Sequence, residues 1–491
     1  MVANPWGFLR HDRTEAPKRP VSERLRDWDP VYGRPAAEDV RVQASRCMDC
    51  GVAFCHAGCP LGNLIPEWNE LVADDDWRAA IERLHATNNF PEFTGWLCPA
   101  PCEASCVLAI NADPVAIKQV ELAIIDRAYD EGWVPPRPAT LSTGRRVAVI
   151  GSGPAGLACA QQLTRAGHHV TVYERSDRLG GLLRYGIPDF KMPKAFIDKR
   201  LAQLAAEGTE LLGGVDVGGP GGPDPVELRA GVDAVVLGSG ALRPRELEVP
   251  GRELAGVHQA MDYLPQANRV RTGDLTAPPV DAAGKHVVIV GGGDTAADCL
   301  GTANRQGAVR VTQLDHNPRP PEGRDETVNP WPQWPKIHRT SAAHEEGVVE
   351  SWAREAVAFL ADPSGQVRAV LAEEVQTVRV DGRRVFRPVP GSRVEIPCEL
   401  VLLAAGFVGT ERGSLLDRLG VAVHPDRGTV QVRGGWETSA DGVFACGDAT
   451  RGASLVVWAI AEGRACAAAV DTALSGRTQL PAPVRPGARP L

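Results

Sequence analysis

The stretch "RVAVIGSGPAGLACAQQLTRAGHHVTVYER" at residues 146–175 decides the fold class of this chain. It predicts a strand, a glycine turn, a helix and a second strand, in that order. Gly151, Gly153 and Gly156 form G-x-G-x-x-G directly after the first strand, where they allow a tight turn, close approach of a pyrophosphate and helix packing. Glu174 ends the second strand, where a carboxylate can accept a hydrogen bond from a ribose hydroxyl. The stretch therefore predicts a dinucleotide-binding unit.

A second copy of this unit occurs in "KHVVIVGGGDTAADCLGTANRQGAVRVTQLD" at residues 285–315. Gly291, Gly293 and Ala296 match G-x-G-x-x-A, and Asp315 ends the second predicted strand 24 residues after Gly291. Two such units in one chain predict two dinucleotides. We therefore expect an α/β fold with two Rossmann-like domains.

Seven of the 12 cysteines are crowded near the N-terminus, in "CMDCGVAFCHAGCP" (47–60) and "CPAPCEASC" (98–106). Their spacing is C-x2-C-x4-C-x3-C-P and then C-x3-C-x3-C. Zinc usually takes well-separated cysteine pairs, whereas a dense run that ends in Cys-Pro is typical of iron–sulfur ligation. The pattern favours iron–sulfur clusters over zinc. Seven thiols are one short of two four-ligand clusters, so either one cluster is incomplete or another side chain supplies the eighth ligand.

Composition and charge narrow the class of protein. The 491 residues are 43% hydrophobic and 23% charged, which suits a globular protein of about three domains. A net charge of −8 without a basic half argues against a nucleic-acid partner. Because the sequence has neither a signal peptide nor a long apolar run, we expect a cytoplasmic protein without a membrane span. Five further cysteines are expected in apolar cores: Cys159, Cys299, Cys398, Cys446 and Cys466.

The predicted secondary structure changes along the chain. Residues 1–140 predict mostly helices, with helical periodicity over 65–88 and 114–132. A proline-rich segment at 134–146 is a candidate linker, after which strands and glycine turns begin. Redox clusters together with two dinucleotides indicate a flavin, a nicotinamide and hydride transfer.

Four motifs in this order, "GSGPAGLACA", "DRLGGLLRYGIPDFKMPK", "VVIVGGGDTAADC" and "GVFACGDATRGASLVVWAIAEGRACA", resemble the two-domain flavin-dependent pyridine-nucleotide oxidoreductases. With its cysteine-rich start, the whole chain resembles the small (beta) subunits of glutamate synthase. Two stretches are similar to that family in particular: "GFLRHDRTEAPKRPVSERLRDWDPVY" at 7–32 and "NPRPPEGRDETVNPWPQWPKIHRTSAAHEEG" at 317–347.

The resemblance implies a division of the chain and a set of cofactor sites. A helical domain with two [4Fe-4S] clusters would span 1–140, an FAD domain 145–280 and 426–491, and an inserted NAD(P)H domain 281–425. The nicotinamide nucleotide is expected at Gly291, Gly293, Asp294, Thr295 and Asp315. The resemblance implies FAD contacts at Gly151, Gly153, Gly156, Glu174, Arg175, Gly181, Leu182, Arg184, Gly447, Asp448, Ser454, Leu455 and Val456.

The resemblance also sorts the cysteines into two ligand sets. In related proteins the first three cysteines of the long run share a cluster with the last cysteine of the second group. Here these are Cys47, Cys50, Cys55 and Cys106. Relatives complete the other set with a Gln or Glu from the following helix. That set would be Cys59, Cys98, Cys102 and Glu121.

Electron counting indicates the predicted route. A nicotinamide delivers two electrons as a hydride, a cluster carries one, and FAD can do both. The resemblance names the acceptor as a large FMN-containing subunit that makes L-glutamate from L-glutamine and 2-oxoglutarate. Hydride transfer requires no general acid or base, so no catalytic side chain is assigned.

Two other functions share these motifs. One is another FAD/iron–sulfur NAD(P)H reductase subunit, of the ferredoxin:NADP or dihydropyrimidine dehydrogenase type, from which "GFLRHDR" and "NPWPQWP" distinguish this chain. The other is a non-catalytic iron–sulfur scaffold, which bleaching of flavin absorbance by NAD(P)H would exclude.

The predicted nucleotide preference is NADH. Many bacterial members of the family use NADPH and place paired arginines just after the second strand, but His316 and Asn317 stand there in this chain. Asp315 would accept hydrogen bonds from a free 2′-hydroxyl and repel a 2′-phosphate. Arg319 and Arg324 lie nearby in sequence and are the alternative contacts for a phosphate.

Overall fold

The computed structural model describes residues 6–381 and 383–489, and two five-stranded parallel sheets form its centre. The first sheet has the strand order β14-β4-β1-β2-β3, so the order reverses beside β1. Strands β1 and β4 are almost wholly buried, because both faces of a parallel sheet are covered. The strand bounds are β1 (Arg146–Ile150), β2 (His169–Glu174), β3 (Glu210–Gly213), β4 (Ala234–Leu237) and β14 (Val443–Ala445).

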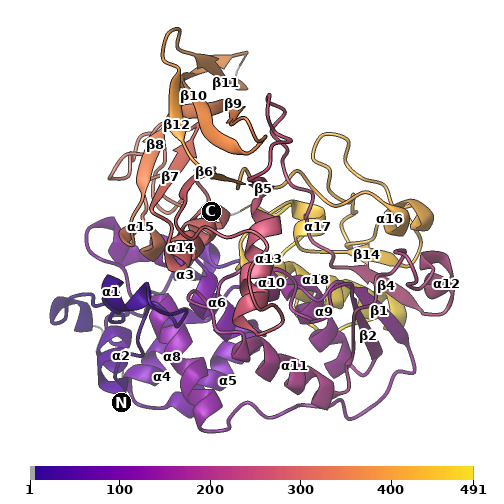
Figure 1. Cartoon of the computed structure of the whole chain (residues 1–491). Coiled ribbons are helices and arrows are strands. Elements are labelled where there is room, and N and C mark those ends of the chain that lie inside the picture. Colours follow the sequence, from indigo (N-terminus) through magenta and orange to yellow (C-terminus); the bar gives the residue numbers. More distant parts are fainter. Residues whose placement is uncertain (1–5, 382, 490–491) are drawn as a thin grey trace.

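Two long helices, α9 and α18, pack against each other beside this sheet (Figure 1). Gly463 of α18 allows the contact, since a Cβ there would lie 2.2 Å from the Ala155 carbonyl oxygen. The helices of this unit are α9 (Pro154–Arg165), α10 (Leu182–Tyr185), α11 (Ala195–Glu207), α12 (Pro225–Ala230), α16 (Ser414–Leu419), α17 (Asp448–Arg451) and α18 (Val456–Ser475).

The second parallel sheet repeats this plan with the strand order β5-β13-β6-β7-β8. Its order reverses beside β6, the strand that precedes the second glycine turn. Its strands are β5 (Val257–Gln259), β6 (His286–Val290), β7 (Arg310–Asp315), β8 (Val349–Trp352) and β13 (Leu400–Leu403). Its helices are α13 (Ala260–Arg271), α14 (Asp294–Gln306) and α15 (Ala342–Glu345).

A small antiparallel sheet is inserted between β8 and β13, and it projects at the top of Figure 1. Its long strand β10 (Val367–Val380) pairs with β9 (Arg354–Ala361), β11 (Arg383–Pro388) and β12 (Val394–Pro397). This sheet was not predicted from the sequence.

The N-terminal region is helical, as expected, and shares its hydrophobic core with α9 and α18. The periodic stretch 65–88 forms two helices because Asp75 adopts a positive φ of 66° and Asp76 caps the second helix by accepting from the Ala79 N–H. The elements are η1 (Gly7–Leu9), α1 (Val21–Arg24), α2 (Ala37–Ala44), α3 (Phe54–Gly58), α4 (Ile65–Ala73), α5 (Trp77–Thr87), α6 (Pro91–Leu97), α7 (Pro101–Ala104), η2 (Val107–Ile110) and α8 (Ile117–Asp130).

The chain passes between the two parallel sheets twice, after β4 and after β13, in both cases before the residues 281 and 426 that the resemblance implies as domain boundaries. Strand β5 already pairs with β13 of the second sheet, although it precedes residue 281. Leu416 and Val421 pack in the core of the first sheet, although they precede residue 426. The two crossovers lie next to each other, since the Arg243 N–H donates to the Gly409 carbonyl oxygen at 3.1 Å.

The apolar run 455–461 lies at the buried start of α18, a helix of 20 residues. Among the described residues, no helix is long and apolar enough to cross a membrane.

Candidate functional site

The first glycine turn forms an open cradle at the end of β1. Gly151 has a φ of +102°, and a Cβ on it would lie 2.5 Å from the Gly238 carbonyl oxygen. A Cβ on Gly156 would lie 2.0 Å from the Gly151 carbonyl oxygen, so this glycine lets α9 pack against the turn. Gly153 differs, because a Cβ on it would meet nothing within 4 Å. Bare backbone that faces open space fits the approach of a pyrophosphate.

Glu174 lies beside this cradle and is buried. Its Oε2 accepts hydrogen bonds from the Ser152 N–H at 3.1 Å and the Ser152 hydroxyl at 2.6 Å. Its Oε1 accepts from the Ser176 N–H at 2.9 Å. These bonds hold a carboxylate at the end of β2, where a ribose hydroxyl is expected.

Two arginines of the predicted FAD site have protein partners. Arg175 forms an exposed ion pair with Glu411. Arg184 is buried and pairs with Asp198. Gly181 and Leu182 begin the same short helix α10, next to the glycine turn. Within the described chain, Arg184 therefore joins α10 to α11, a contact that the motif did not indicate.

The C-terminal part of the predicted FAD site lies against the first cradle. A Cβ on Gly447 would lie 2.5 Å from the Ala155 Cβ, so the end of β14 touches the start of α9. Burial raises the pKa of Asp448 to about 6, and the Ser454 hydroxyl donates to its Oδ1 at 2.6 Å. Sequence reasoning missed Glu462, which accepts from the Gly447 N–H at 3.0 Å and braces this turn.

The second glycine turn forms a similar cradle at the end of β6. Gly291 has a φ of +133°, and a Cβ on it would lie 2.2 Å from the Ala404 carbonyl oxygen. Gly293 again faces open space, and Asp294 and Thr295 form the first turn of α14. This turn is more exposed than the first one.

Asp315 is buried at the end of β7 and faces the second cradle. A Cβ on Gly292 would lie 1.7 Å from Asp315 Oδ2. Asp315 Oδ1 accepts from Asn317, from its N–H at 2.8 Å and its Nδ2 at 2.7 Å. Arg384, which sequence reasoning missed, comes from the inserted sheet and donates to Asn317 Oδ1.

The two arginines considered from sequence are engaged elsewhere. Arg319 pairs with Glu322 at 2.6 Å. Arg324 donates to the carbonyl oxygens of Asn329 at 3.2 Å and Gln333 at 2.7 Å. Both side chains therefore brace the loop after β7.

The crowded cysteines line two separate pockets in the N-terminal region. Cys47, Cys50, Cys55 and Cys106 line one of them, here called the first pocket. Burial raises the pKa of Cys47 and of Cys55 to about 12. Thiols buried this way become thiolates only when a cation compensates the charge, as iron would.

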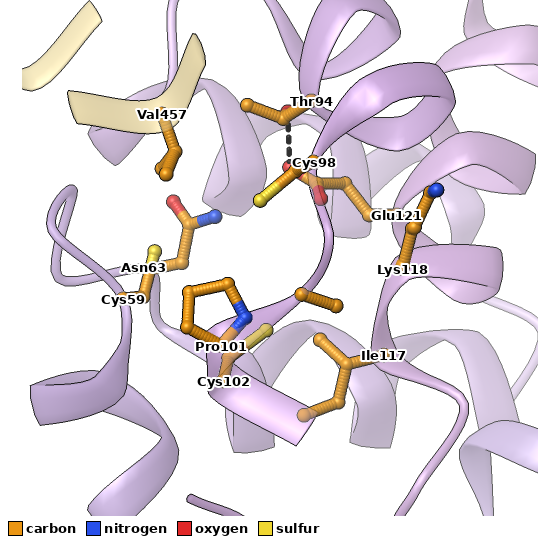
Figure 2. A pocket seen from close by; sticks show the side chains of 11 residues that line it. Cys59, Asn63, Thr94, Cys98, Pro101, Cys102, Ile117, Lys118, Glu121 and Val457 are labelled. Atoms are coloured by element: carbon orange, nitrogen blue, oxygen red, sulfur yellow. Dashed lines mark hydrogen bonds between the residues drawn. The ribbon is translucent and has the colours of Figure 1, made fainter. Parts of the chain in front are cut away.

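The second pocket is lined by Cys59, Cys98, Cys102 and Glu121 (Figure 2). Each of the two pockets draws on both cysteine segments. Burial raises the pKa of all three thiols, that of Cys59 to about 11. Each pocket thus offers four donors, which fits one four-iron cluster per pocket.

Glu121 reaches the second pocket from α8. Its Oε1 accepts hydrogen bonds from Asn88 Nδ2 and Thr94 Oγ1, both at 2.9 Å, and Figure 2 shows the carboxylate beside Cys98. Burial raises its pKa to about 7. A carboxylate in this place can supply the missing eighth ligand. Within the described residues, no three His, Cys, Asp or Glu side chains are grouped so as to hold a single metal ion.

The second pocket adjoins the predicted flavin site through one helix. Val457 lines the pocket, and Ser454, Leu455 and Val456 directly precede it at the start of α18. The beginning of α18 therefore lies between the C-terminal part of the FAD site and the thiols of the second pocket.

Two known families match separate parts of the chain. Residues 145–463 match the pyridine nucleotide-disulphide oxidoreductase family. Residues 24–133 match the family described as dihydropyrimidine dehydrogenase domain II, 4Fe-4S cluster.

Individual relatives and a solved structure are also similar to this chain. The glutamate synthase [NADPH] small chain of Mycobacterium tuberculosis (strain CDC 1551 / Oshkosh) is 59% identical over 100% of both chains. The glutamate synthase [NADH] of Schizosaccharomyces pombe is 43% identical over 97% of this chain and 23% of its own length. The structure of Mycobacterium tuberculosis FprA in complex with NADPH covers 67% of this chain and 83% of its own, with a TM-score of 0.54. At 19% identity, this last likeness concerns the fold alone.

Gly153→Val should abolish flavin binding without unfolding the chain. The new side chain enters open space in the protein but overlaps the expected pyrophosphate, so bound flavin should fall below about one tenth of the wild-type content. Flavin absorbance per chain and the thermal midpoint are the measurements. Gly435→Val is the control, because that glycine also faces open space, is exposed and lies outside the G-x-G-x-x-G motif. Full flavin content in Gly153→Val would contradict the assignment.

Cysteine variants should separate the two pockets. Cys47→Ala and Cys106→Ala should leave the same residual paramagnetic signal, because they line one pocket. Cys102→Ala should leave the other signal, and Glu121→Ala should perturb the cluster that Cys102→Ala removes. Iron analysis should give about eight irons per wild-type chain. Cys398→Ala is the control, since Cys398 is buried in another core. Matching signals from Cys47→Ala and Cys102→Ala would refute the sorting.

Proposed function

Because this chain belongs to the glutamate synthase small-chain family, we propose that it is the electron-input subunit of a glutamate synthase. In this proposal it oxidises NAD(P)H at FAD and passes the electrons through two [4Fe-4S] clusters. The acceptor is a large FMN-containing subunit, which makes L-glutamate from L-glutamine and 2-oxoglutarate. The observation that carries the proposal is the pair of four-donor pockets, one of which adjoins the start of α18.

The residues of the proposed sites have different roles. The backbone at Gly151, Gly153 and Gly156 and the Glu174 carboxylate bind FAD, together with Gly447 and Asp448 from the end of β14. A bound FAD supplies the conversion between a two-electron hydride and single electrons. The protein contributes by holding the nicotinamide and flavin cradles, and by burying five of the seven crowded thiols.

The two pockets differ in how completely their cysteines are buried, which suggests an order for the electron route. The second pocket contacts Val457 and has buried thiols throughout, so we assign it to the flavin side. In the first pocket Cys50 is only partly buried, and its neighbour Val52 is 74% exposed. We assign the first pocket to the side from which electrons leave for the large subunit.

Two features support a preference for NADH. The Asp315 carboxylate is placed beside the second cradle, as Glu174 is beside the first, and can accept from a free 2′-hydroxyl. Arg319 and Arg324 are engaged within their own loop, so neither is placed to bind a 2′-phosphate.

One feature favours NADPH instead. Arg384 is the one cation found near Asn317 among the described contacts, and a cation there favours a 2′-phosphate. The names of the relatives include both NADPH and NADH enzymes.

The proposed location is the cytoplasm. All 12 cysteines are free thiols, seven of them crowded into two pockets, and a reducing compartment keeps such thiols available for iron.

The proposed function is tested by anaerobic isolation of the chain with its bound partner. We expect a flavoprotein partner, and NAD(P)H-dependent formation of glutamate from glutamine and 2-oxoglutarate. The chain without its partner should still show rapid bleaching of flavin absorbance by NAD(P)H. A complex that forms no glutamate, although its flavin and clusters are present and reduced, would overturn the proposal.

The nucleotide preference is tested by kcat/KM for NADH and NADPH. Wild type should favour NADH, and Asp315→Ala should move the ratio toward NADPH by at least about tenfold, because it removes repulsion of the 2′-phosphate. Arg319→Ala is the control and should leave the ratio unchanged, since Arg319 is paired with Glu322. A wild-type enzyme tenfold better with NADPH, or an unchanged ratio in Asp315→Ala, would show that Asp315 does not read the ribose.

A further inference from the structure

The loop between β7 and α15 carries the sequence "NPWPQWP" at 329–335, which the proposed electron route does not use. This loop leaves the second sheet and contacts both cysteine segments of the N-terminal region. Trp331 Nε1–H donates to the Cys106 carbonyl oxygen at 3.3 Å. The Trp331 ring also packs against Phe54, next to Cys55, with ring centroids 4.7 Å apart and planes tilted by 49°. One side chain thus bridges the two segments that line the first pocket.

A second contact fixes the same junction. The Ser105 hydroxyl donates to the Pro332 carbonyl oxygen at 3.0 Å. In the bond at Cys106 the loop is the donor, and in the bond at Ser105 the loop is the acceptor. Together they hold the backbone at Cys106, the only donor of the first pocket that comes from the second segment.

The tip of the loop has a defined shape of its own. The backbone N–H of Trp331 donates to Glu326 Oε2 at 2.9 Å. Arg324 donates to the carbonyl oxygens of Asn329 and Gln333 on either side of the tip. The indole is therefore presented to the N-terminal region by a braced loop.

We propose that Trp331 is a positioning residue for the iron–sulfur cluster of the first pocket. The inference rests on the proposed function, because it assumes that this pocket holds a cluster. The indole Nε1–H of Trp331 orients the Cys106 segment. The indole ring packs against Phe54 and thereby covers the segment around Cys55. Partners of a ligand segment and exclusion of water both set cluster potentials. Among the described contacts of Trp331, none reaches the residues that line the second pocket, so Trp331 tunes the cluster of the first pocket selectively.

The test is a potentiometric titration of the holoprotein, followed by the paramagnetic signals of the two clusters. Trp331→Phe keeps an aromatic ring against Phe54 and removes the N–H, whereas Trp331→Ala removes both contacts. Trp334→Phe is the matched control, because Trp334 lies in the same loop and stacks with Arg339 instead, at 4.2 Å.

With full iron content, Trp331→Phe should shift the midpoint potential or the signal of one cluster only, the one that Cys106→Ala removes. Trp331→Ala should shift it further and bleach that cluster several-fold faster in air. The flavin, the other cluster and Trp334→Phe should match wild type. Unchanged potentials, signals and bleaching in both Trp331 variants, or equal changes in Trp334→Phe, would overturn the inference. A wild-type chain that holds no cluster in the first pocket would instead refute the proposed function.

Discussion

A buried ion pair between the helical region and the first dinucleotide unit holds the molecule in the arrangement that the proposed electron route needs. Arg200 of α11 donates to both carboxylate oxygens of Glu92 in α6, at 2.7 and 2.6 Å, and both side chains are at most 1% exposed. Loss of one partner of such a pair costs about 3–5 kcal/mol, since it leaves a buried charge uncompensated. Helix α6 leads directly to Cys98, so this pair also fixes the second pocket against the flavin unit.

Helix α18 completes this junction. Its first turn lies at both the predicted flavin site and the second pocket, and its middle packs on α9, which starts at the first glycine turn. Further along it, Arg464 donates to Asn89 and to the Ala86 carbonyl oxygen of the helical region. The shared core of these helices holds the predicted flavin site and the second pocket together.

The part of this structure that follows local chemical rules was predictable from sequence. The turns at Gly151 and Gly291 required glycine after apolar strands, and those strands lie side by side with their neighbours in two parallel sheets. Glu121 could be named only through the family resemblance, since helical glutamates are mostly solvated and nothing local marks this one as buried. The contacts of Trp331 and Arg384 join segments more than 60 residues apart, so no periodicity or spacing revealed them. The inserted antiparallel sheet was missed for a related reason, because its strands are recognised by their pairing with one another and not by a sequence motif.

The central claim is that one chain holds a two-electron carrier and two one-electron carriers in fixed proximity. Controlled-potential coulometry on the isolated, fully loaded chain tests it most directly, because it counts electrons without any partner or substrate. The account predicts uptake of about four electrons per chain, two with loss of flavin absorbance and one for each of two distinct paramagnetic signals. Uptake of only two electrons by a chain with full flavin and iron content would contradict it.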